Sequence, residues 1–151
     1  LHRLQSSLRE RQVGGDNHVA EWGVIGMAYR KGYKFEREIF NLFQSAGYYC
    51  IRSAGSHGIF DIIAVKNGVT FGIQCKYNNH INKREELAMK TAYKQFGIIP
   101  LYAYRFKGKP LCIKCLITNK LIDVENLDEL PKLYVQKVIG KIVEKNGGDK
   151  R

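Results

Sequence analysis

Apolar and polar residues follow two patterns along the chain, one typical of helices and the other typical of strands. Apolar side chains recur at helical spacing over residues 35–46, which Gly47 ends, and again over residues 82–96, which Gly97 ends. Shorter runs rich in β-branched and aromatic residues predict five strands, over residues 48–53, 61–66, 70–76, 100–106 and 111–117. The order of helix, three strands, helix and two strands predicts an α/β fold.

A hairpin signal joins the second and third of these strands. The dipeptide Asn67-Gly68 lies between them, and it is the strongest short-range indication of a tight β-turn. We therefore expect the two strands to be antiparallel neighbours. Side chains on a strand alternate between its two faces, so Gln74 and Lys76 share one face while Ile73 and Cys75 share the other.

The first 26 residues show little periodicity. Turn-prone residues 14–17 interrupt them, which argues against one continuous helix. We interpret residues 1–26 as an N-terminal extension. Three alternatives remain open for it: a flexible arm, a short helix over residues 4–11, or sequence upstream of a natural start at Met27.

The rest of the chain divides into a main domain and a C-terminal segment. The main domain covers residues 27–120 and contains all the strands predicted above. Residues 121–151 are interpreted as a helical segment with a polar tail. Within that segment we expect a turn of helix over residues 126–130 and an amphipathic helix over residues 134–144.

Composition and charge narrow the class of protein. With 151 residues, 44% of them apolar, the chain suits one domain with one hydrophobic core, and a disordered basic tail is excluded. No run approaches the roughly 18 apolar residues of a membrane span, and the first thirty residues carry scattered charges without an apolar h-region, so we expect a cytoplasmic protein without membrane contact. The net charge of +11 predicts a polyanionic partner. Residues 27–109 hold 14 Lys and Arg against 5 Asp and Glu, so the excess belongs to the main domain.

The four cysteines do not form a pattern typical of zinc. A structural zinc site needs four ligands, usually as two close pairs. Only one close pair exists, Cys112 and Cys115, while Cys50 and Cys75 lie in two other apolar runs. We expect reduced thiols buried in the core and no structural zinc.

Three polar residues around the hairpin indicate chemistry. Asp61 begins a strand directly after a glycine-rich loop, and the turn brings the face of Gln74 and Lys76 beside it. Oxygen ligands of this kind hold Mg²⁺ or Mn²⁺, and a nearby lysine positions or deprotonates a nucleophile in phosphodiester cleavage. The alternative is structural: Asp61 is a turn residue, and Gln74 and Lys76 form a solvated strand face.

Several separated motifs resemble the archaeal Holliday-junction resolvases, which belong to the PD-(D/E)xK nuclease superfamily. The motifs occur in the order typical of that family, over residues 27–38, 52–58, 60–64, 74–76 and 96–100. The resemblance implies a restriction-endonuclease-like core with a central mixed β-sheet flanked by helices. It also implies a homodimer that binds branched double-stranded DNA, a four-way junction, and cuts two strands symmetrically with Mg²⁺ or Mn²⁺.

The resemblance also implies roles for individual catalytic residues. Glu36 is similar to the acid that the family carries on a helix, Asp61 to its principal metal ligand and Lys76 to its catalytic lysine. The backbone carbonyl of Cys75 would be a further metal ligand, so its thiol would have no part in catalysis. Ser56, in the glycine-rich loop, resembles the hydroxyl of the family's site.

A second group of residues is expected to contact DNA. Arg37 and Arg52 resemble phosphate contacts of the family. Lys31 and Lys34 are added on charge and position alone. His57, beside Ser56, is either a phosphate contact or a solvated turn residue.

The chain departs from the family at two motif positions. Gln74 stands where the family has Glu, and Phe60 stands where a Pro often precedes the Asp. An amide oxygen can still bind Mg²⁺, so we keep Gln74 among the metal ligands and catalytic residues, although one negative charge is lost.

The function that the sequence predicts is that of a metal-dependent endonuclease resolving four-way junctions. The alternatives are another PD-(D/E)xK DNA nuclease, of repair or restriction type, and a non-catalytic DNA-binding member of the fold.

Overall fold

The computed structural model describes residues 19–53 and 58–134. The chain forms two compact units, residues 1–34 and residues 35–151. The first helix among the described residues, α2 (Val19–Ser45), includes residues of both units. The strands described below all belong to the second unit. Among the described residues, no helix has the length and apolar character needed to cross a membrane.

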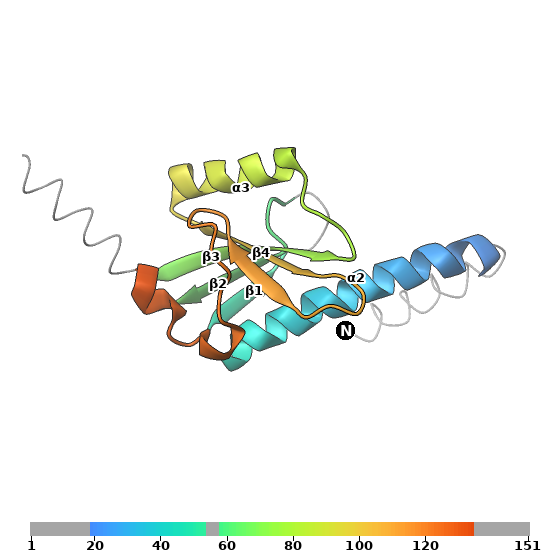
Figure 1. Ribbon diagram of the computed structural model, residues 1–151, viewed down its shortest axis with the longest axis horizontal. Coiled ribbons are helices and arrows are strands. Elements are labelled where there is room, and N and C mark those ends of the chain that lie inside the picture. The colour runs from blue at the N-terminus through green and yellow to red at the C-terminus, as the bar shows by residue number, and fades with distance from the viewer. Residues whose placement is uncertain (1–18, 54–57, 135–151) are drawn as a thin grey trace, which may run out of the picture. The chain divides into compact units, whose positions relative to one another are not determined.

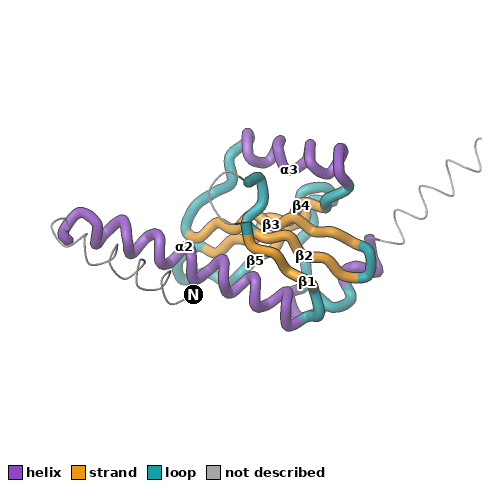
Figure 2. The backbone as a smooth tube through the Cα atoms, turned by 180° about the vertical axis from the view of Figure 1, so that it is seen from behind, coloured by secondary structure: helices purple, strands orange, loops and turns teal. Residues whose placement is uncertain are grey.

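A mixed five-stranded sheet lies at the centre of the second unit (Figures 1 and 2). Its strands lie side by side in sequence order: β1 (Tyr49–Arg52), β2 (Ile62–Lys66), β3 (Val69–Tyr77), β4 (Ile99–Arg105) and β5 (Cys112–Cys115). Neighbouring strands are antiparallel except β3 and β4, which are parallel. Helix α3 (Lys83–Phe96) provides the crossover that a parallel pair requires. The predicted α/β fold with a central mixed sheet is confirmed.

The β2–β3 hairpin forms where the sequence predicts it. Asn67 and Gly68 have φ angles of 52° and 77°. Positive φ at both central residues is the geometry of the turn that matches strand twist, and Asn-Gly adopts it with little strain. The turn places Lys66 opposite Val69 and, further along, Ile62 opposite Ile73. This register determines which residues meet at the far end of the hairpin.

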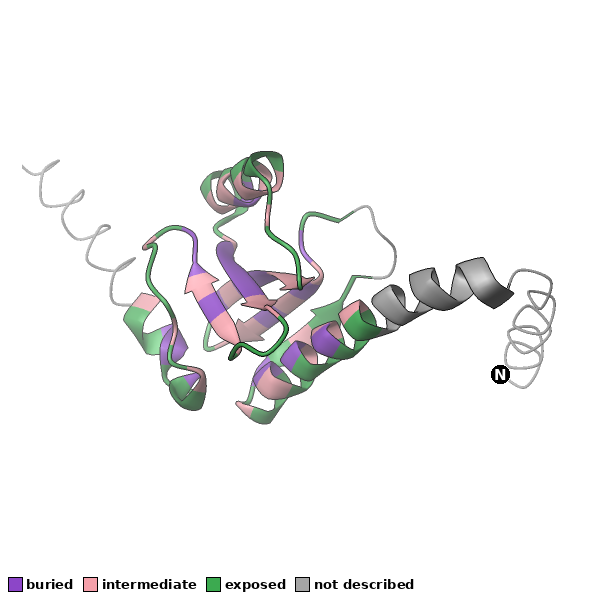
Figure 3. Ribbon diagram, turned by 45° about the vertical axis from the view of Figure 1, so that its right-hand side comes forward, coloured by how far each residue is buried: buried purple, intermediate pink, exposed green. Residues whose placement is uncertain are grey.

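The C-terminal part of α2 covers one face of the sheet, here called the α2 face. Phe35, Ile39 and Phe43 follow each other at helical spacing and are almost completely buried. They pack with strand residues such as Phe71 and Leu101 in the larger of two hydrophobic clusters. Figure 3 shows buried segments, in purple, along this part of α2 and along the strands of the sheet. Burial of this apolar stripe anchors the helix and therefore positions the polar residues next to it.

Helix α3 covers the opposite face, here called the α3 face. Its buried residues Met89 and Ala92 pack with Phe60, Tyr102 and Leu116 in a smaller cluster. The Phe60 ring lies directly over Gly72 of β3, because a Cβ built at Gly72 would be 2.6 Å from that ring. Only glycine at this position allows the aromatic ring to approach the strand so closely.

Helix α2 begins sixteen residues before the predicted start, at Val19 rather than at residue 35. The prediction rested on apolar periodicity, which the earlier residues lack. A helix that already exists extends more easily than a new one forms, because each added residue brings a hydrogen bond without a new nucleus. Backbone propagation therefore produces helix where hydrophobic spacing does not indicate it.

The chain after β5 packs on the α2 face. A short 3-10 helix, η2 (Val124–Asn126), is followed by helical residues 130–134, so the expected single turn over residues 126–130 is divided in two. Leu127 and Leu130 belong to the larger cluster, and the Tyr48 hydroxyl donates to the Leu127 carbonyl at 2.7 Å. The helix expected over residues 134–144 lies outside the described residues, apart from its first residue.

All four cysteines are free thiols. Cys115 is buried in the larger cluster, as predicted, whereas Cys50, Cys75 and Cys112 are only partly buried. The prediction of fully buried thiols is therefore correct for one cysteine. Cys50 and Cys112 lie on the two edge strands, β1 and β5, whereas Cys75 lies on the central strand β3.

Candidate active site

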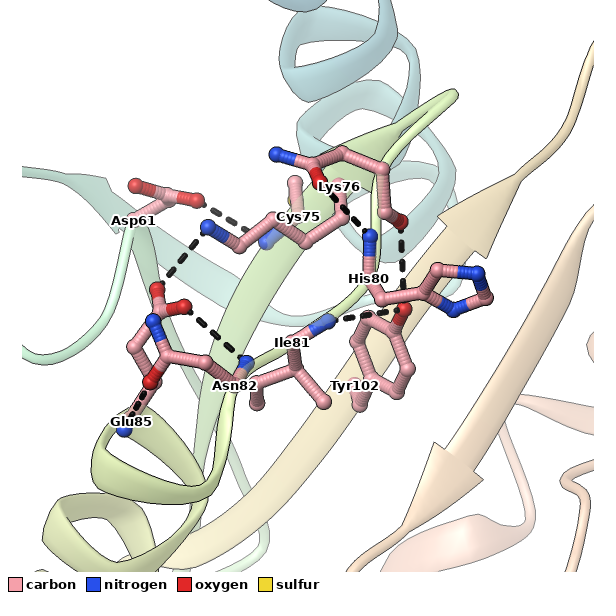
Figure 4. Close-up of polar contacts among 9 residues, drawn as sticks. Asp61, Cys75, Lys76, His80, Ile81, Asn82, Glu85 and Tyr102 are labelled. Carbon is pink, nitrogen blue, oxygen red and sulfur yellow. Dashed lines mark hydrogen bonds and ion pairs between the residues drawn. The ribbon is translucent and has the colours of Figure 1, made fainter.

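The first candidate, Asp61, lies at the open end of the β2–β3 hairpin. It directly precedes β2, and its backbone N–H donates to the carbonyl oxygen of Ile73 at 2.8 Å. Its carboxylate Oδ2 accepts a hydrogen bond from the backbone N–H of Cys75, also at 2.8 Å (Figure 4). These two bonds hold the Asp61 carboxylate against the end of β3, next to Lys76. The turn and the strand alternation therefore bring Asp61 and Lys76 together, as expected.

The surroundings of Asp61 disfavour the ionised form of its carboxyl group. Burial is the main cause that raises the pKa of Asp61 above its ordinary value of 3.8, and the nearby carboxylates of Glu36 and Glu85 raise it further. The Cys75 N–H and the Lys76 ammonium act in the opposite direction but do not outweigh these effects. A partly buried carboxylate with acidic neighbours favours an added cation, because the cation relieves both desolvation and repulsion.

Glu36 reaches the same region from helix α2. Phe35 and Ile39 on that helix are buried, so Glu36 projects at the border of the α2 face. Its Oε1 forms an ion pair with Nε of Arg52 at 2.7 Å. Arg52, predicted as a phosphate contact, therefore also contacts the candidate metal ligand. Its side chain remains 37% exposed, which leaves the guanidinium accessible from solvent.

Lys76 forms an ion pair that the sequence did not predict. Its Nζ lies 2.8 Å from Oε2 of Glu85, in the first turn of helix α3 (Figure 4). The N-cap residue Asn82 and Glu85 form a capping box, in which each side chain accepts a hydrogen bond from the other residue's backbone N–H. The Asn-x-x-Glu spacing of this box is readable in the sequence. Its contact with Lys76 depends on how α3 packs.

Gln74 lies two residues before Lys76 on the same side of β3 and is partly buried. Within the described residues, no group of three or more His, Cys, Asp and Glu side chains has a geometry that would hold a metal ion. The structure brings the carboxylates of Asp61 and Glu36 within electrostatic reach of each other, and the Gln74 amide and the Cys75 carbonyl are the further oxygen donors that the sequence predicts for the site. A set made only of oxygens fits Mg²⁺ or Mn²⁺ rather than zinc. Two carboxylates instead of three make it a weakly charged set.

The Cys75 thiol also lies within electrostatic reach of the Asp61 and Glu36 carboxylates. Cys75 packs against the cluster of the α2 face, and burial raises the pKa of its thiol well above the ordinary value. A thiol held neutral in an apolar environment is a poor nucleophile and a poor metal ligand. This supports the expectation that only the backbone of Cys75 takes part in the site.

The remaining candidates lie elsewhere or outside the described residues. Arg37 is exposed on α2, next to Glu36 in sequence. Lys31 and Lys34 are exposed and belong to the first unit, outside the unit that holds the site. Ser56 and His57 lie outside the described residues, so their predicted roles stay predictions.

Comparison with known proteins bears on this arrangement. A family profile described as archaeal Holliday junction resolvase (Hjc) matches residues 27–144. The chain belongs to this family. The resemblance inferred from separated motifs is therefore confirmed, and the match extends beyond the motifs into the C-terminal segment.

Two individual proteins illustrate how the chain compares with other Hjc proteins. The crossover junction endodeoxyribonuclease Hjc of Methanocaldococcus jannaschii is 38% identical over 89 residues, which are 56% of this chain and 66% of that relative. The solved structure of Archaeoglobus fulgidus Hjc, a Holliday junction resolvase from an archaeal hyperthermophile, is similar in fold. Its TM-score is 0.50 at 23% identity, and the similarity covers 66% of this chain and 93% of that one.

Proposed function

We propose that this protein is an endonuclease that resolves four-way DNA junctions by metal-dependent hydrolysis of phosphodiester bonds. The observation that carries the proposal is the convergence of Asp61, Lys76 and Glu36 at one end of the hairpin, in a chain of the Hjc family. The M. jannaschii relative bears the name of a crossover junction endodeoxyribonuclease. Acidic oxygens beside a lysine are what hydrolysis of a phosphodiester requires.

Asp61, Glu36, Gln74 and the Cys75 carbonyl are the groups that would hold Mg²⁺ or Mn²⁺. Such an ion, when bound, lowers the pKa of a water molecule and neutralises charge on the phosphate. The Lys76 ammonium would orient the attacking water or stabilise the developing negative charge. Arg52 and Arg37 are placed to bind neighbouring phosphates, since guanidinium groups match phosphate oxygens.

The substrate and the assembly belong to the proposal as well. A four-way junction presents phosphate positions and branch shape rather than sequence, and the positive charge of residues 27–109 suits such a target. Symmetric cutting of two strands requires two sites, so we propose a homodimer. The cytoplasm stays the predicted location.

The decisive experiment compares cleavage of a four-way junction with cleavage of a linear duplex of the same sequence, with Mg²⁺ or Mn²⁺. We expect paired cuts in the junction and little cleavage of the duplex. Lys76→Ala is expected to lower the rate by about 100-fold or more, as for loss of a group that acts on the reacting atoms, while junction binding persists. Equal cleavage by the wild type and Lys76→Ala would refute the assignment, and equal cleavage of both substrates would favour a repair or restriction nuclease.

Gln74 supports one other candidate, a DNA-binding protein that has lost efficient metal binding. The neutral amide removes a charge from the oxygen set at the motif position. Calorimetric titration with Mn²⁺ separates the two candidates. Binding that disappears in Asp61→Ala supports the nuclease, whereas no binding, or binding that does not depend on Asp61, supports the non-catalytic protein.

A further inference from the structure

Glu85 is fixed by contacts on both of its carboxylate oxygens. Oε1 accepts a hydrogen bond from the backbone N–H of Asn82 at 3.2 Å, and Oε2 pairs with Nζ of Lys76 at 2.8 Å. The Glu85 backbone N–H in turn donates to the Asn82 side chain at 2.8 Å. The first oxygen thus belongs to the cap of α3, and the second faces strand β3. Each contact restricts a different part of the side chain.

The helix that carries Glu85 is itself held in place. Met89 and Ala92 are buried against the α3 face, within one and two turns of Glu85. Burial disfavours the charged form of Glu85, but the hydrogen bonds from Lys76 and from the Asn82 backbone prevail and lower the pKa of this carboxyl. Glu85 is therefore an ionised partner for Lys76, and burial of Met89 and Ala92 holds its helix, α3, in place.

Strand β3, which carries Lys76, has no acidic residue. Asp61 lies within electrostatic reach of Lys76, and the ion pair that Lys76 forms is with Glu85. The neighbour on the same side of β3 is Gln74, whose amide carries no charge. A lysine side chain has four flexible carbons and loses considerable rotamer freedom when it is fixed. With only 19% of the Lys76 side chain exposed, the ammonium lies at the rim of the site and contacts Glu85 there.

We propose that Glu85 is a positioning residue that holds the Lys76 ammonium in the site, and so provides from helix α3 the anionic partner that Gln74 does not provide on the strand. The expected effect of Glu85 on the cleavage rate rests on the proposed nuclease function. Its expected effect on the mobility of the Lys76 ammonium does not. Prior orientation of a catalytic group lowers the barrier, because the entropy of fixing it has already been lost in the folded protein. Glu85 contacts Lys76 and has no assigned contact with substrate.

The neighbouring acid provides a matched control. Glu86 pairs with Lys90 at 3.3 Å in an (i, i+4) bridge within α3, and both side chains are more exposed than that of Lys76. Glu85→Gln removes the charge but retains the capping box, because Gln at this helix position also accepts the backbone hydrogen bond. Glu86→Gln makes the same chemical change one residue away. Asn82→Ala weakens the cap and leaves the carboxylate, so it reports the effect of helix destabilisation alone.

The first measurement is nitrogen-15 NMR of the lysine ammonium groups, with the Lys76 signal assigned by its loss in Lys76→Ala. We expect a resolved signal in the wild type and in Glu86→Gln, and a broadened or missing signal in Glu85→Gln. This measurement needs neither metal nor DNA. A Lys76 signal unchanged by Glu85→Gln would overturn the inference, even if the protein proves to have no nuclease activity.

The second measurement is single-turnover cleavage of saturating junction, together with junction binding in the absence of a divalent metal. We expect Glu85→Gln to lower the rate by about 10- to 100-fold with unchanged binding, and Glu86→Gln and Asn82→Ala to retain most of the rate. In a Lys76→Ala background, Glu85→Gln should cause no further loss, because both changes affect one group. An additive loss, or a wild-type rate in Glu85→Gln, would overturn the inference, whereas an inactive wild type would count against the proposed function alone.

Discussion

The two faces of the central sheet differ in what they bury. Among the described residues, sixteen buried side chains form the cluster on the α2 face and five form the cluster on the α3 face. Gln74, Lys76 and Glu85 all belong to the α3 side, where the smaller cluster leaves the rim of the sheet to charged groups. The α2 face therefore supplies most of the hydrophobic stabilisation, whereas the α3 side carries these polar side chains. Asp61 and Glu36 lie where the two faces meet, at the end of the hairpin.

The largest expected effect tests the α2 face as the source of stability. Phe43 is completely buried between α2 and the sheet, so Phe43→Ala is expected to lower the free energy of unfolding by about 3–5 kcal/mol. Chemical denaturation measures this loss. Leu87→Ala, at a side chain that is 67% exposed on α3, is the control and should change stability little. A loss at Phe43 no larger than at Leu87 would contradict the comparison.

A smaller effect is expected where the α3 face is tightly packed. Gly72→Ala places a methyl group 2.6 Å from the Phe60 ring, and relief of this overlap requires the ring to move. We expect a loss of about 1–3 kcal/mol in the free energy of unfolding. Because Phe60 precedes Asp61, cleavage should fall more than thermal unfolding alone explains. Unchanged stability would show that this face adjusts more easily than the structure indicates.

The change Asp61→Asn tests the border between the faces and should act in the opposite direction on stability. Asn retains an oxygen to accept from Cys75, but it removes a charge that burial and neighbouring acids oppose. We expect a modest rise in melting temperature at pH 7 and loss of cleavage. The folded-state pKa is raised, so ionised Asp61 destabilises the protein above that pKa and has no effect below about pH 3.8, where it is protonated in both states. The difference in melting temperature should therefore shrink as the pH falls, and a constant difference would contradict this explanation.

The smallest effect is expected for the substitution Gln74→Glu. An added carboxylate strengthens the oxygen set for Mg²⁺, so cleavage should be kept or raised, and half-maximal activity should require less metal. The same charge lies near Asp61 and Glu36 and should slightly lower stability without metal. A metal titration of the cleavage rate, with melting temperatures measured in EDTA, checks both effects. Loss of cleavage in Gln74→Glu would show that the amide itself is required.

Much of the fold can be predicted from the sequence because it depends on short-range preferences. The Asn67-Gly68 turn, the strand alternation of Gln74 and Lys76, and the end of α3 at Gly97 each depend on a few adjacent residues. The family is likewise recognisable from motifs in sequence order. By contrast, apolar spacing in the sequence does not indicate the start of α2 at Val19, because an existing helix extends by adding backbone hydrogen bonds without a new nucleus.

The candidate site likewise has one part that the sequence predicts and another part that it does not. The sequence by itself determined which residue types lie at the hairpin end, since the turn and the strand period together bring Asp61 and Lys76 to one place. Only the tertiary structure decided their partners: Cys75 N–H for Asp61, Glu85 for Lys76 and Arg52 for Glu36. These contacts join different strands and helices, so they depend on how buried side chains orient α2 and α3 against the sheet. Local sequence preferences carry no information about such angles, whereas packing of the two hydrophobic clusters determines them.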